Sequence, residues 1–251
     1  MKNVQHSFLF ASRLLLLGVL VTACQKTPTL TEPNDNAGRD AVLAWNQASM
    51  AAITRMTNPT TGFFVLPHVE GRAYAIVNLA MYDALNSIEQ KNAPYALQTS
   101  LVPGASPDAA VCTAAHDALV AVLPAQKAYA DSLYQAMLAK IGSDNAKTLG
   151  VTLGQAAAQA VLTKRLNDGA DAAQTPFPIG TDPGDYQYTP PFDGPPFNGY
   201  YALCGWKDVK PFMLTTAGQF RVGPPLALTS TTYTTDFNEV KCIGGTSSGL
   251  G

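Results

Sequence analysis

His68 and His116 are the side chains in this sequence best suited to acid–base catalysis or metal binding, because histidine titrates near neutral pH. His68 falls in the first turn of a predicted helix, and His116 lies among alanines within another. Neither has a carboxylate at helical spacing that forms a recognisable site, and the adjacent Asp117 is expected to point away from His116. We therefore expect packed or hydrogen-bonded histidines, and we assign no catalytic, cofactor-binding or metal-binding residue.

A second chemical pattern, Gly245 to Gly249, matches the G-x-S-x-G motif of a nucleophilic serine. That motif requires a preceding strand, a following helix and a downstream histidine, whereas His116 is the last histidine of the sequence. The match is interpreted as accidental. No glycine-rich phosphate-binding motif occurs either, so nothing predicts a nucleotide cofactor.

Polar residues also occur inside one apolar helical pattern, at Arg72, Asp83 and Asn86. Some of these groups are expected to face inward, and a buried charge requires a partner. We predict an internal ion pair or a cap for a neighbouring loop rather than a ligand site.

Asp182, Asp185 and Asp193 supply oxygens that could bind calcium weakly, but they lack the regular spacing of a calcium-binding loop. Because prolines and glycines separate them, turn formation is the preferred interpretation.

The cysteines give no metal-binding or redox pattern, since the sequence contains no Cys-x-x-Cys. Cys112 lies in an alanine-rich helix and is expected to pack as a small apolar residue. Cys204 and Cys242 lie in a loop-rich region, where they could form a disulfide or remain free.

Composition limits the class of protein. The 251 residues are 47% hydrophobic, enough to bury a sizeable core. The 16 Lys and Arg nearly balance the 18 Asp and Glu and form no basic runs, which argues against a nucleic-acid partner.

The first 23 residues are typical of a bacterial signal peptide. Lys2 and Arg13 precede an apolar stretch that is too short to span a bilayer, and Val-Thr-Ala-Cys then resembles a lipobox ending at Cys24. Cys24 is the predicted lipid attachment site, and residues 24–36 are the predicted flexible tether to the outer membrane of the cell envelope. The alternative is an ordinary secretory signal with an incidental cysteine.

Helical spacing of apolar residues predicts an all-α domain over residues 37–168. The expected helices span Arg39 to Met56, Pro67 to about Ile88, Pro107 to about Val122, Pro124 to Ile141, and about Ser143 to Asn167. Gly169 is expected to end the last helix. Gly150, Gly154 and Ala158 are four residues apart, which allows another helix to approach closely.

Residues 169–251 hold more than half of the 18 prolines and 20 glycines, so regular structure is expected to be sparse there. A loop-rich segment of this length either wraps over the helical body or meets a partner surface. Its many aromatic residues favour wrapping, as an extension of the same domain.

Residues spread over 39–241 together resemble the N-terminal half of bacterial vanadium-dependent haloperoxidase-like proteins, which are relatives of the phosphatidic acid phosphatase superfamily. The resemblance is carried by Arg72, Ala80 to Ala84, Asp108 to Ala110, Ala114 to His116, Gly150, Gly154, Arg165, Asp168-Gly169, Pro211-Phe212, Gln219 to Arg221, Pro224-Pro225, Ser230, Tyr233 and Glu239 to Lys241. Their order and spacing, rather than any single motif, make the pattern.

The resemblance implies an all-helical fold and, in active members, vanadate held as a phosphate mimic that activates peroxide for halide oxidation. Family members bind the oxyanion through a lysine and an arginine, a Ser-Gly-His segment, and a later arginine and histidine. Those motifs follow the matched region, and this sequence has no Arg-Pro and no Ser-Gly-His. Lys241 belongs to the preceding Glu-Val-Lys segment, so no family site residue is carried over to it.

The expected function is therefore the N-terminal part of a haloperoxidase-like exported lipoprotein, lacking the catalytic half and inactive alone. The alternative is a non-catalytic scaffold or binding lipoprotein built on the helical half. Expected partners are the membrane, through the lipid anchor, and a separate catalytic half or a second copy of the chain.

Overall fold

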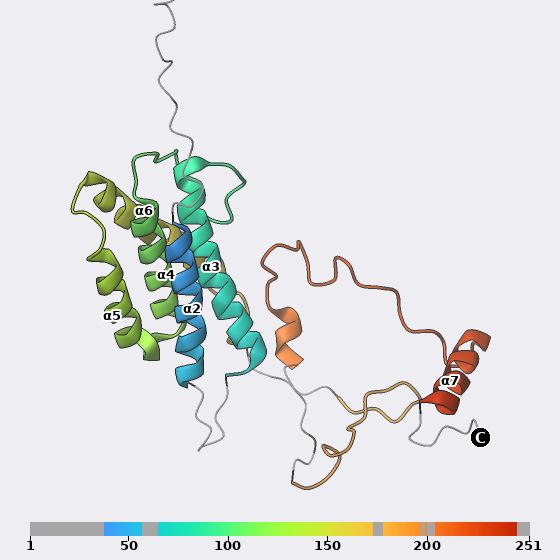
Figure 1. Ribbon diagram of the computed structural model, residues 1–251. Helices are drawn as coiled ribbons and strands as arrows, with labels where there is room; N and C mark the ends of the chain where they lie inside the picture. Colours follow the sequence, from blue (N-terminus) through green and yellow to red (C-terminus); the bar gives the residue numbers. More distant parts are fainter. Residues whose placement is uncertain (1–37, 57–64, 173–177, 197–198, 200–203, 245–251) are drawn as a thin grey trace, which may run out of the picture.

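The computed structural model describes residues 38–56, 65–172, 178–196, 199 and 204–244. Within these residues all regular structure is helical, with no strand (Figure 1). The elements are α2 (Arg39–Met56), α3 (Pro67–Glu89), α4 (Pro107–Val122), η1 (Pro124–Gln126), α5 (Lys127–Leu138), α6 (Asn145–Arg165), η2 (Cys204–Asp208) and α7 (Thr231–Ile243). The expected all-α fold is confirmed.

Capping residues explain where several helices begin. The Ser106 side chain accepts a hydrogen bond from the Ala109 N–H before α4, and the Asp144 side chain accepts one from the Lys147 N–H before α6. Pro67 opens α3 without a side-chain cap.

The helix after Pro124 differs from expectation. It begins with the 3-10 turn η1, and α5 ends at Leu138 rather than Ile141. The end of α6 differs as well, because the helix stops at Arg165 and Gly169 is not its cap. The chain instead reverses through Asn167, at a φ of 55°, and Gly169, at a φ of 92°. This reversal brings Asp168 back against the side chain of Arg165.

The core of the bundle is centred on α4, which packs against α2, α3, α5 and α6. Small alanines dominate the buried face of α4, so its neighbours approach closely. The largest fully buried side chains around it are Trp45 of α2 and Ile76 and Met81 of α3.

Two glycines of α6 set its distance from α4, as their spacing predicts. A Cβ atom at Gly150 would lie 2.6 Å from the Ser106 carbonyl oxygen, and one at Gly154 would lie 2.5 Å from the Ala110 carbonyl oxygen. Backbone therefore meets backbone at this crossing, and no larger side chain fits.

Residues 206–212 lie along the first turns of α3 and the end of α6, whereas from Met213 to Gly244 most residues are exposed and none is buried. Figure 1 shows α7 apart from the bundle, and none of its residues is buried. Ser230 caps α7 by accepting a hydrogen bond from the Tyr233 N–H. This helix was not expected from the sequence.

Several sequence predictions lie outside the described residues. They concern the signal peptide, Cys24, the tether at residues 24–36 and the motif from Gly245 to Gly249. Among the helices that the structure describes, none is both long enough and apolar enough to cross a membrane.

Candidate functional site

Asp168, in the turn after α6, is the centre of a buried charge cluster. Its Oδ2 atom accepts hydrogen bonds from Nε of Arg72 and Nε of Arg165, each at 2.9 Å. Only 2% of the Asp168 side chain and 1% of the Arg165 side chain are exposed. The prediction that Arg72 joins an internal ion pair is confirmed.

Two cations surround this one carboxylate. Burial opposes ionisation of Asp168, but hydrogen bonds from Arg72 and from the Ala170 N–H, with the charges of Arg72 and Arg165, lower its pKa. The cluster therefore keeps a net positive charge at neutral pH.

The charge cluster fastens a distant part of the chain to the bundle. Arg165 donates hydrogen bonds to the carbonyl oxygens of Lys210 at 2.6 Å and Pro211 at 3.1 Å. The Lys210 N–H donates to the carbonyl oxygen of Asp168 at 2.8 Å. Phe212 then covers the cluster, with the Arg165 guanidinium 3.9 Å from its ring centroid.

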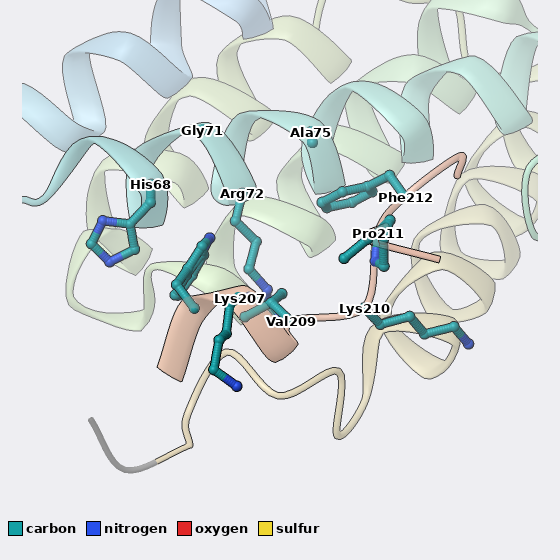
Figure 2. Close-up of a pocket in the computed structure, with 11 residues that line it drawn as sticks. His68, Gly71, Arg72, Ala75, Lys207, Val209, Lys210, Pro211 and Phe212 are labelled. Atoms are coloured by element: carbon teal, nitrogen blue, oxygen red, sulfur yellow. The ribbon is translucent and has the colours of Figure 1, made fainter. Parts of the chain in front are cut away.

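An open cleft of about 450 Å³ lies beside this cluster, between the first turns of α3 and residues 206–212. Figure 2 shows His68 at one end and Pro211 and Phe212 at the other, with Arg72 between them. Trp206 also lines the cleft. The rings of His68 and Trp206 meet edge to face, with centroids 4.2 Å apart. Gly71 leaves open space on the α3 side, since a Cβ atom there would meet nothing within 4 Å.

The polar groups of the cleft are mostly committed elsewhere. Arg72 pairs with Asp168, and Lys207 pairs with Asp208 at 2.7 Å. In Figure 2 the ammonium groups of Lys207 and Lys210 point away from α3. The cleft thus has room for a small, largely apolar molecule, but it brings together no general acid–base pair within the described residues.

Burial lowers the pKa of His68, so its imidazole is neutral at pH 7. Its Nδ1 atom is buried and has no hydrogen-bond partner among the described residues. His68 is thus a packed side chain against Trp206, in line with the sequence prediction.

Asp83 and Asn86 of α3 hold the loop that follows the helix. The fully buried carboxylate of Asp83 accepts hydrogen bonds from the backbone N–H groups of Tyr95, Ala96 and Leu97 at 2.7, 2.7 and 2.8 Å. Asn86 exchanges two hydrogen bonds with the backbone of Asn92. The predicted loop-capping role is confirmed.

His116 forms a second polar cluster, between α4 and α5. Its Nδ1 lies 2.7 Å from Asp117 Oδ1, and its Nε2 lies 2.8 Å from Asp131 Oδ1. The expectation that His116 and Asp117 point apart was wrong, because the two side chains turn toward each other on the surface of α4 and come within hydrogen-bond distance. His116 is a hydrogen-bonded histidine, as predicted, but with carboxylates on both nitrogens.

The remaining candidates are structural. The Asp182 N–H donates to Asp185 Oδ2 at 2.9 Å, and the Asp185 N–H donates to the Asp182 carbonyl oxygen at 3.0 Å, so these residues form a turn. Cys112 is buried in the core, as predicted. Cys204 and Cys242 are both free thiols, the first buried and the second exposed. No cluster of three metal-binding side chains occurs in the described part of the chain.

Sequence reasoning missed the partners of these clusters. Arg165 and Asp168 are three residues apart, a spacing that could have indicated their ion pair. Asp131 and Trp206 reach His116 and His68 only through tertiary packing, so no local signal indicated them.

Comparison of the chain with protein-family profiles, with curated proteins and with solved structures gives no match.

Proposed function

We propose that this chain is the helical framework of a haloperoxidase-like protein, and that it performs no vanadate-dependent halide oxidation by itself. In this role it positions the segment that leads into α7, while the oxyanion site and its acid–base residues belong to a catalytic half.

One observation carries the proposal. Residues that make the sequence resemblance are scattered over more than a hundred positions, yet Arg72, Arg165, Asp168, Pro211 and Phe212 meet at one buried cluster. A chance collection of similar residues has no reason to converge in space. Their convergence supports a shared architecture in which this cluster fastens the C-terminal segment.

Other residues of the resemblance also have framework roles. Asp83 caps a loop with three hydrogen bonds, and Gly150 and Gly154 allow α4 to approach α6. Ser230 caps α7. Such roles suit the supporting half of an enzyme and supply no acid, base or oxyanion ligand.

The nucleotide sequence that follows the codon for Gly251 tests this assignment. If any reading frame there encodes Ser-Gly-His followed by a later histidine, the assignment stands. If a conventional intergenic region follows and no separately encoded helical half co-purifies with the chain, the assignment is overturned.

The exposed apolar surface of residues 213–243 favours a second candidate, a non-catalytic scaffold lipoprotein that uses this surface for protein contacts. Its exposed large side chains include Phe220, Val222, Phe237, Val240 and Ile243. Large exposed apolar surfaces mark sites of protein interaction.

A scaffold must be stable without a catalytic half, whereas a framework without its other half should aggregate or dimerise. The association state of the purified chain therefore distinguishes the two candidates. A monomer that is monodisperse in sedimentation velocity and unfolds cooperatively would favour the scaffold. Aggregation or dimerisation that is suppressed by Phe237→Ser with Val240→Ser would favour a framework that lacks its other half. Asn46→Ser on the exposed surface of α2 is the matched control, which should change neither behaviour.

We further propose export and lipid attachment at Cys24, which places the framework at the cell envelope. Metabolic labelling with a radioactive fatty acid should mark the wild-type chain and not Cys24→Ala. Equal labelling of the two chains would contradict the anchor.

A further inference from the structure

His116 has an acidic partner on each ring nitrogen, and the two partners come from different helices. Asp117 belongs to α4, like His116, whereas Asp131 belongs to α5. The separations of 2.7 Å to Asp117 Oδ1 and 2.8 Å to Asp131 Oδ1 are both those of charge-assisted hydrogen bonds. The imidazole therefore bridges α4 to α5.

Two carboxylate acceptors require two N–H donors. Neutral imidazole carries one N–H group, so a lone pair would face one of the carboxylates. The imidazolium donates from both nitrogens and satisfies Asp117 and Asp131 together. The observed geometry thus fits the protonated ring.

α5 buries little of its own surface, although Tyr134 also lies within hydrogen-bond distance of Thr113 of α4, at 3.1 Å. Ala130 is its one fully buried residue, and its larger apolar side chains are only partly buried. Among the helices of the bundle, α5 packs chiefly on α4. An amphipathic helix with so little buried surface is weakly docked without additional contacts.

We propose that His116 is a pH-sensitive latch, whose protonated ring holds α5 against α4 and whose deprotonation loosens that helix.

Each helix packed around His116 presents groups to its ring, and His116 is the group whose protonation changes in the latch. From α5, Lys127 contacts Asp131 Oδ2 at 2.6 Å and Tyr134 stacks on the ring with centroids 4.4 Å apart. From α2, the uncharged Trp45 meets the ring edge at a centroid distance of 6.3 Å. Burial raises the pKa values of Tyr134 and of Cys112 in α4, so both remain neutral near pH 7.

The pH window follows from the two partners. The hydrogen bond to Asp117 raises the pKa of His116, burial opposes this, and the bond to Asp131 raises it further, so the net shift is upward from 6.5. A raised pKa means that the latch is complete below pH 6.5 and is lost as pH rises through the His116 value. Hydrogen bonds from Lys127 and His116 lower the pKa of Asp131 from 3.8, so the Asp131 contribution to the latch is complete above pH 3.8 and is lost as pH falls through the lowered pKa.

Amide hydrogen exchange of the full chain tests the latch. The result is expressed as protection factors, because these remove the intrinsic effect of pH on the exchange rate. Between pH 5.5 and pH 8.5, protection in α5 should fall by about tenfold for each unit by which docking raises the pKa of His116. Protection in α6 should change little. Equal protection of α5 at the two pH values, or a parallel loss in α6, would overturn the latch.

Two matched histidine variants separate the latch from general pH effects. His116→Gln should give α5 low protection at both pH values, whereas His68→Gln, on α3, should keep the wild-type pH response. Retention of the full response by His116→Gln would overturn the proposal.

If His116→Gln fails to fold, NMR titration of the wild-type histidine rings decides. The His116 midpoint should lie above 6.5 and above that of His68, and the α5 amides should shift with the same midpoint. A His116 midpoint at or below 6.5 would overturn the latch.

Discussion

Arg72 and Asp168 lie 96 residues apart in sequence, and their side chains form an ion pair with Nε and Oδ2 2.9 Å apart. Arg165 shares the same oxygen, and its other nitrogens hold the carbonyl groups of Lys210 and Pro211. The Asp168 carboxylate therefore joins α3 to α6, and Arg165 together with the Asp168 carbonyl group holds the segment that leads to α7.

Removing the charge of Asp168 should strongly destabilise the fold. Asp168→Asn would leave the buried guanidinium of Arg165 without its counter-charge, at a cost of about 3–5 kcal/mol. Urea denaturation measures this change in the free energy of unfolding. Asp208→Asn, at an exposed ion pair with Lys207, is the matched control and should change stability by less than about 1 kcal/mol.

Acidification should weaken the same cluster. Because the pKa of Asp168 is lowered in the folded chain, its contribution to stability is complete above pH 3.8 and is lost as pH falls through the lowered value. Urea midpoints measured at several pH values below 5 should therefore fall less steeply for Asp168→Asn than for wild type. Parallel slopes for the two proteins would contradict the assigned role of this carboxylate.

The loop after α3 should depend on Asp83. Asp83→Ala would leave the buried N–H of Tyr95 and those of Ala96 and Leu97 without acceptors, at about 1–3 kcal/mol each where water cannot replace them. We expect a total loss of at least about 3 kcal/mol in urea denaturation. The exposed Glu89→Gln on the same helix should cost less than about 1 kcal/mol, and equal effects for the two changes would refute the capping role.

Alanine substitutions at two helical glycines should change the free energy of unfolding in opposite directions. Gly154→Ala would place a Cβ atom 2.5 Å from the Ala110 carbonyl oxygen and force α4 and α6 apart, so we expect a loss of about 1–3 kcal/mol. Gly71→Ala meets nothing within 4 Å and should stabilise α3 by up to about 1 kcal/mol, since alanine favours the helix. Thermal melts of the two variants compare the signs directly.

The helices of the bundle were largely predictable because their signals are local. Ser106 with Pro107 marked the start of α4, and the glycine spacing of α6 indicated a close helix crossing. Inward-facing Asp83 was also predictable, since a charge among apolar neighbours needs a partner. Ser230 caps α7 in the structure, but the dense prolines and glycines of residues 169–251 predicted sparse regular structure there.

The partners across the fold were not predictable, because tertiary packing alone brings them together. Asp131 reaches His116 only when α5 folds back on α4, and Phe212 reaches Arg165 from 47 positions along the chain. The prediction that Asp117 points away from His116 was wrong for a different reason. Adjacent helical residues differ in direction by about 100°, yet two flexible polar side chains can still bridge that angle.

We propose above that this framework does not oxidise halide without a catalytic half. The most direct test supplies the purified, cooperatively folded chain with vanadate, hydrogen peroxide and bromide, and follows bromination of monochlorodimedone. The account predicts no loss of monochlorodimedone above the rate without protein. Vanadate-dependent turnover above that rate would contradict it.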